Sequence, residues 1–275
     1  MTAFIPPKME LTRHKDMINM DRTNLPIAFF DSGVGGISVL RHAVRLLAHE
    51  NFLFFGDSAN APYGTRPREE ILALTLGHAA RFHERGIKAL VIACNTATSA
   101  AINDLRRIYT DIPVVGIEPA LKPAALMSPH PTVLVMATPG TVNGNKFHDL
   151  LGHYCDRADV IPLGCPGLME YVESGNTDGP QVRTYLVKLL TPHLEKTHVD
   201  AIVLGCTHYP FVAPAIREIA GSDVRIFDGG EGTARELKRR LTRGHLLRDC
   251  HERGSVTFEN SLPEKIALCE RLLYS

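Results

Sequence analysis

Residues 89–97 read Ala89-Leu90-Val91-Ile92-Ala93-Cys94-Asn95-Thr96-Ala97. The apolar, β-branched run predicts a buried strand, and the small polar residues after the cysteine favour the start of a helix. The same design returns as Ala201-Ile202-Val203-Leu204-Gly205-Cys206-Thr207-His208-Tyr209. A strand that carries a thiol at its carboxyl end places sulfur where open α/β sheets bind ligands. We therefore expect two thiols, one from each half of the molecule, to face one substrate.

Strands and helices alternate along the rest of the chain in two similar cycles. The first cycle opens with the apolar run 27–30 and the glycine-rich turn 31–36. The second opens with the apolar run 133–138 and the turn Pro139-Gly140-Thr141. Such alternation predicts parallel sheets covered by helices on both faces. The predicted fold class is α/β, with two similar doubly wound domains, mainly parallel sheets, a pseudo-twofold relation and the active site between the domains.

The two cycles also predict the domain organisation. Residues 1–24 are polar and methionine-rich, which indicates an N-terminal extension rather than a secretory signal. We expect residues 25–119 and 228–275 to form the first domain. Residues 120–227 then form the second domain, inserted between the two parts of the first.

Composition and charge exclude several classes of function. The 275 residues include 30 Lys and Arg against 30 Asp and Glu, so no electrostatic footprint points to nucleic acid or an anionic membrane. No apolar run reaches the roughly 20 residues that cross a bilayer. The six cysteines show no CxxC spacing. Without an export signal, we expect reduced thiols and a cytoplasmic protein.

Two of the six cysteines point to chemistry. A buried cysteine is commonly a small apolar residue, and we interpret Cys155, Cys165, Cys250 and Cys269 in that way. Cys94 and Cys206 differ because they occupy equivalent places in the two cycles. Each is expected beside a helix N-terminus, which lowers the pKa of a thiol. Two equivalent thiols suit inversion of a stereocentre, in which one thiolate removes a proton and the opposite thiol donates one.

The glycine-rich turn Asp31-Ser32-Gly33-Val34-Gly35-Gly36 is a second candidate for ligand contact. It lacks the lysine of a P-loop and the third glycine of a dinucleotide-binding turn. A bare turn of this kind commonly serves only to connect a strand to a helix. Asp31 lies at the strand end, however, where a carboxylate suits a cationic amine better than a phosphate.

Several motifs together resemble one family. They are Asp31–Gly36, Gly56-Asp57, Pro62-Tyr63-Gly64, Ala93–Ala97 and Gly205-Cys206-Thr207-His208-Tyr209-Pro210. From about residue 26 to the end, the chain resembles the cofactor-independent aspartate/glutamate racemase superfamily. The histidine after Cys206-Thr207 is similar to the glutamate racemases of that superfamily.

The resemblance implies a role for each matching residue. Cys94 and Cys206 are then the two acid/base residues, Asp31 assists the first, His208 assists the second, and Glu173 matches a third assisting acid. The substrate-binding residues so implied are Asp31, Ser32, Tyr63, Gly64, Asn95, Thr96, Thr207 and His208, with Thr138 and Thr141 as additional contacts. The chain departs from the family at Gly229, where serine is expected, and at Glu170, where an apolar residue or proline is usual.

The implied activity is interconversion of L- and D-glutamate without pyridoxal phosphate, metal or nucleotide. The resemblance further implies supply of D-glutamate for peptidoglycan synthesis and a homodimer. Three alternatives remain open from the sequence. The protein could be an aspartate, hydantoin or other racemase, or a maleate-type isomerase. Cys94, Cys206 and His208 could hold structural zinc, or the two cysteines could form a redox pair.

Overall fold

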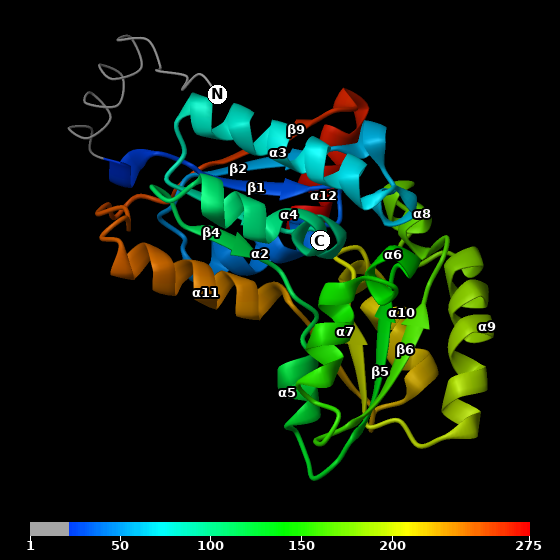
Figure 1. Ribbon diagram of the computed structural model, residues 1–275. Coiled ribbons are helices and arrows are strands. Elements are labelled where there is room, and N and C mark those ends of the chain that lie inside the picture. Colours follow the sequence, from blue (N-terminus) through cyan, green and yellow to red (C-terminus); the bar gives the residue numbers. More distant parts are fainter. Residues whose placement is uncertain (1–21) are drawn as a thin grey trace, which may run out of the picture.

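The computed structural model describes residues 22–275, which form two parallel sheets with helices packed on them (Figure 1). The predicted extension at residues 1–24 lies outside the described residues except for its last three, which form the short 3-10 helix η1 (Arg22–Asn24). Within residues 22–275, no helix has the length and apolar character needed to cross a membrane.

The first sheet has the strand order β4-β3-β1-β2-β9, with every pair parallel. Its strands are β1 (Ile27–Asp31), β2 (Phe52–Gly56), β3 (Ala89–Ile92), β4 (Val114–Gly116) and β9 (Val256–Asn260). The central strands β1 and β3 are buried along their whole length, as expected for a parallel sheet covered on both faces.

Alternation along β1 sends its side chains to two different cores. Ile27 and Phe29 join the cluster that includes α2 (Ile37–Leu46), α11 (Gly230–Arg243) and α12 (Ile266–Tyr274). Ala28 and Phe30 join the cluster under α3 (Arg68–Arg85) and α4 (Asn95–Ile108). The 3-10 turns η2 (Ser58–Asn60), η3 (Tyr63–Thr65) and η5 (Pro263–Lys265) complete this part of the molecule.

The second sheet has the order β6-β5-β7-β8 and is also fully parallel. Its strands are β5 (Thr132–Ala137), β6 (Asp159–Gly164), β7 (Ala201–Leu204) and β8 (Arg225–Asp228). Around it lie α5 (Leu121–Ala125), α6 (Pro139–Val142), α7 (Asn145–Gly152), α8 (Leu168–Glu173), α9 (Pro180–Lys196), η4 (Tyr209–Val212) and α10 (Ala213–Ala220). Helices α5, α6 and α10 were not predicted, because segments this short show little periodicity.

The two sheets repeat one strand order. Read in matching directions, β4-β3-β1-β2 corresponds to β8-β7-β5-β6, so β3 and β7 hold equivalent positions. These are the strands that precede Cys94 and Cys206. The α/β class with two doubly wound parallel sheets is therefore confirmed.

The end of the chain returns to the first sheet. After β8, helix α11 packs on α2, and β9 pairs with β2 from Phe52–Val256 to Gly56–Asn260 (Figure 1). This arrangement is what an inserted second domain requires, and the boundaries at 119/120 and 227/228 stay a prediction.

Candidate active site

The carboxyl ends of strands from both sheets meet at one small cavity. Its volume is about 10 Å³, close to the minimum that holds one water molecule. The cavity is lined by Ser32, Tyr63, Gly64, Cys94, Asn95, Thr96, Thr138, Thr141, Met169, Gly205, Cys206, Thr207 and His208. Every predicted site residue except Asp31 and Glu173 is among them. Met169 and Gly205 are lining residues that the sequence prediction missed.

Cys94 follows β3 and caps helix α4. Its sulfur accepts a hydrogen bond from the Ala97 N–H at 3.4 Å and lies 3.4 Å from the Ser32 hydroxyl. Burial, with a smaller contribution from Asp31, raises the pKa of Cys94 to about 12. The hydrogen bonds with Ser32 and Ala97 lower the pKa of Cys94, but by less than burial raises it. The prediction of a lowered pKa was therefore wrong for this thiol, because desolvation exceeds the effect of the helix N-terminus.

Cys206 follows β7 but does not begin an α-helix. The next element is η4, and α10 starts only at Ala213. Pro210 has no N–H to donate to a helical hydrogen bond, and the chain instead closes a short turn with the Phe211 N–H donating to the His208 carbonyl at 3.2 Å. The expected α-helix N-terminus is thus present at Cys94 and absent at Cys206. The neighbour of Cys206 is His208, whose Nδ1 lies 3.6 Å from the sulfur.

His208 and Glu173 form a buried ion pair behind Cys206. The Nε2 of His208 lies 2.7 Å from Glu173 Oε1, and the His208 side chain is 1% exposed. Burial alone lowers the pKa of His208, but the hydrogen bonds and charges of Cys206 and Glu173 raise it well above its ordinary value. Burial raises the pKa of Glu173, and His208 more than reverses this effect. The arrangement therefore favours an imidazolium paired with a carboxylate.

Glu173 also connects the two halves of the site, the one built on the first sheet and the one built on the second. Its Oε1 accepts a second hydrogen bond from the Val34 N–H at 2.7 Å, although Val34 belongs to the turn after β1. Its Oε2 lies 3.4 Å from the hydroxyl of Ser58. A Cβ at Gly33 would collide with this carboxylate, so only glycine permits the close approach. Glu173 thus acts on the cavity through His208 rather than by lining it.

Asp31 lies directly behind the cavity wall. It is fully buried, and its carboxylate accepts hydrogen bonds from the Gly33 N–H at 2.9 Å and the Thr207 hydroxyl at 3.0 Å. Burial raises the pKa of Asp31, and His208 is the largest opposing influence. Because Thr207 follows β7 while Asp31 ends β1, this contact spans both sheets.

The remaining polar lining consists mainly of hydroxyl groups. Thr138 donates to Thr141 at 3.0 Å, and the hydroxyl of Thr96 lies 3.4 Å and 3.3 Å from these two. Asn95 Oδ1 is buried and has no hydrogen-bond partner among residues 22–275, which leaves an acceptor for a ligand donor. The cavity therefore offers donors, acceptors and two thiols within one closed space.

The geometry bears on two alternatives that the sequence left open. All six cysteines are free thiols, so Cys94 and Cys206 are not joined in a disulfide. Over the described part of the chain, no group of three or more His, Cys, Asp or Glu side chains could hold a metal ion. The arrangement of Cys94, Cys206 and His208 therefore gives no support to a structural zinc site.

Comparison with known proteins gives the class of protein. The family model described as Asp/Glu/Hydantoin racemase matches residues 35–237. The chain belongs to this family and is an amino-acid racemase.

Within the family, the chain is similar to individual glutamate racemases. A glutamate racemase of Clostridium perfringens (strain ATCC 13124) is 48% identical over 245 residues, covering 89% of this chain and 94% of that protein. The crystal structure of glutamate racemase isoform RacE1 from Bacillus anthracis matches with a TM-score of 0.82 and 31% identity, over 92% of this chain and 95% of that one. The glutamate racemase of Francisella tularensis, solved in complex with D-glutamate, matches with a TM-score of 0.79 and 28% identity, over 92% of this chain and 95% of that one. The protein is thus similar to glutamate racemases along nearly its whole length.

Proposed function

We propose that the protein interconverts L- and D-glutamate by proton transfer at the α-carbon between Cys94 and Cys206. The main support is the placement of the two thiols. The two thiols follow equivalent strands, β3 and β7, and line one cavity from different sheets. The glutamate substrate is supported by the 48% identity to curated glutamate racemases and by the relative solved with D-glutamate.

The two sulfurs differ in their surroundings. The protonated His208 offers its Nδ1–H to Cys206 at 3.6 Å, while burial keeps Cys94 as a neutral thiol. We propose that for one enantiomer Cys206 acts as the base and Cys94 as the acid. The Cα–H bond breaks as an S–H bond forms on Cys206, and the proton of the Cys94 thiol forms the new Cα–H bond on the opposite face. For the reverse reaction the two roles exchange.

The buried polar groups suit the charges of an amino acid. A substrate ammonium group near Asp31 would replace the hydration that this carboxylate has lost and favour its ionised form. The donors among Ser32, Asn95 and the threonine hydroxyls face the cavity, where they can bind carboxylate oxygens. Fixed donors in a site without water stabilise the negative charge that develops when the α-proton leaves.

Substrate entry requires the two halves to separate. A cavity of about 10 Å³ is far too small for an amino acid. The hydrogen bonds Asp31–Thr207, Val34–Glu173 and Ser38 to the Thr207 carbonyl, at 3.0, 2.7 and 2.8 Å, all join the two halves. We propose that these contacts break on opening and re-form around the substrate, which excludes water during proton transfer.

The test follows the hydrogen at the α-carbon. Purified protein is incubated with each glutamate enantiomer in heavy water, beside Cys94→Ser, Cys206→Ser and the exposed control Cys155→Ser. We expect the product to carry deuterium at the α-carbon and both active-site variants to lose racemisation, while the control remains active. Unchanged turnover in either variant would remove that thiol from the mechanism. Equal activity on aspartate would overturn the assignment of glutamate as the specific substrate.

The cellular role is proposed on the same basis. D-Glutamate made by this enzyme would supply peptidoglycan synthesis in the cytoplasm, and growth of a depleted strain only with added D-glutamate tests this. We also propose a homodimer, which light scattering of the purified protein tests by its mass.

A further inference from the structure

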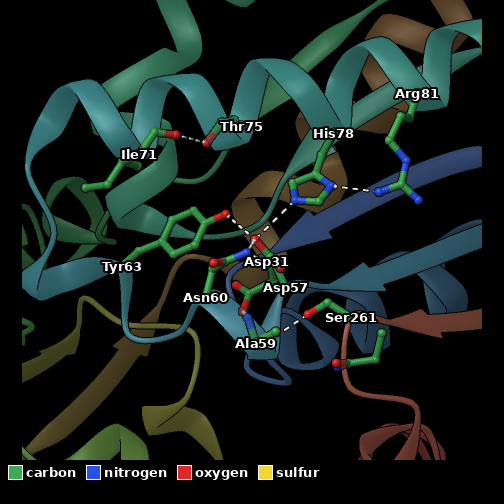
Figure 2. A network of polar contacts seen from close by, with 12 residues as sticks. Asp31, Asp57, Ala59, Asn60, Tyr63, Ile71, Thr75, His78, Arg81 and Ser261 are labelled. Carbon is green, nitrogen blue, oxygen red and sulfur yellow. Dashed lines mark hydrogen bonds and ion pairs between the residues drawn. The ribbon is translucent and has the colours of Figure 1, made fainter.

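Asp57 is a buried carboxylate that does not line the cavity. It follows β2 and is 1% exposed, and its N–H donates to the Asp31 carbonyl at 2.9 Å. Its side chain accepts hydrogen bonds from three residues, which surround it in Figure 2. The distances are 2.7 Å to Tyr63 Oη, 3.0 Å to Asn60 Nδ2 and 3.1 Å to His78 Nε2.

This network keeps Asp57 charged although it is buried. Burial alone raises the pKa of Asp57, but hydrogen bonds from His78, Tyr63 and Asn60 lower it to about 2. The other nitrogen of His78 lies 3.5 Å from Arg81, on the same face of α3 (Figure 2). A charged acceptor forms stronger hydrogen bonds than a neutral one, so the three donors are firmly held.

Tyr63 connects this network to the cavity. It is 1% exposed and lines the cavity together with Gly64. Its ring centroid lies 6.2 Å from that of Phe30, the residue before Asp31 in β1. Burial and the charge of Asp57 raise the pKa of Tyr63, so its hydroxyl stays protonated and donates to Asp57. This wall of the cavity is therefore hydrogen-bonded to a carboxylate that does not itself line the cavity.

We propose that Asp57, supported by His78, is a positioning residue that fixes Tyr63 against the Cys94 side of the cavity. The proposal rests on the proposed two-thiol racemisation. Asp57 and Tyr63 belong to the same half of the molecule as Cys94. This loop also reaches the half that carries Cys206, because Ser58 lies 3.4 Å from Glu173 and Gly64 packs closely against Thr138 and Gly140. Loss of the Asp57 charge should therefore slow proton transfer at Cys94 more than at Cys206.

The test compares Asp57→Asn, Tyr63→Phe and the double variant. The matched control is Asp111→Asn, because Asp111 also pairs with a histidine, His83, at 3.0 Å but lies away from the cavity. Each single variant loses a hydrogen bond to a charged group, so we expect its kcat/KM to fall roughly 10- to 150-fold. The kcat/KM of the double variant should lie within about threefold of that of either single variant, because both substitutions disrupt the same hydrogen bond. The control should stay within about twofold.

Isotope effects separate positioning from a general structural role. With α-deuterated L- and D-glutamate, slower transfer at Cys94 should raise the isotope effect for the enantiomer whose proton Cys94 removes and lower it for the other. Unchanged isotope effects for both enantiomers, or additive losses in the double variant, would overturn the proposal. If Asp57→Asn fails to fold by circular dichroism, the same isotope measurement on Tyr63→Phe decides. Absence of racemisation in the unmodified protein would instead overturn the proposed function.

Discussion

Replacing Glu173 by glutamine tests the link between His208 and closure of the site. The carboxylate accepts hydrogen bonds from the Val34 N–H and from His208 Nε2, both at 2.7 Å. Glutamine has a similar shape but carries no charge, and its single carbonyl oxygen must serve both donors. The substitution therefore removes the counter-charge of His208 without leaving a cavity.

The expected loss follows from the charged hydrogen bond. Such bonds contribute about 1.5–3 kcal/mol, so kcat/KM should fall roughly 10- to 150-fold. Cys206 and Glu173 raise the pKa of His208, because their hydrogen bonds and negative charge favour the imidazolium. Without that charge His208 loses its proton at lower pH. The alkaline limb of the pH profile should therefore move to lower pH.

The measurement is kcat/KM from pH 6 to 10, in both reaction directions, for Glu173→Gln and for Glu170→Gln. Glu170 lies on the same helix α8 but is exposed, which makes it a matched control. The control should keep both the rate and the profile of the unmodified protein. A Glu173→Gln profile with its alkaline limb unmoved would refute the assigned ion pair, and a kcat/KM within twofold would refute its importance for catalysis.

Two further substitutions test closure and stability. Gly140→Ala should raise KM about tenfold, because the added Cβ would collide with the Gly64 carbonyl in the other half of the molecule. The control is Gly152→Ala, which should leave KM unchanged because an added Cβ at Gly152 has no atom within 4 Å. An unchanged KM for Gly140→Ala would mean that this approach is not needed for binding. Lys88→Ala should lower the free energy of unfolding by about 3–5 kcal/mol, because it leaves the buried carboxylate of Glu50 without its ion-pair partner. Urea denaturation measures this loss, and a value below about 1 kcal/mol would contradict it.

The strand patterns and the repeat were accessible from the sequence. Apolar runs such as 27–30 and 89–92 became buried parallel strands, because only a sheet covered on both faces accepts such continuous apolar segments. The repeated thiols after β3 and β7 could likewise be read from the residues. The polar lining residues rested on resemblance to a family, and the structure brings them to the same cavity as the thiols.

The tertiary structure decided what depends on distant contacts and on burial. The 2.7 Å contact of Glu173 with Val34 joins residues 139 positions apart, and no local pattern encodes it. The pKa of Cys94 is raised rather than lowered, because desolvation depends on everything packed around the sulfur. His78 looks like an ordinary helix residue in the sequence, and only packing of α3 over β1 and β2 brings it to Asp57. Local sequence specifies strands, turns and the residues at their ends, while packing of the two sheets sets the charges and distances with which those residues act.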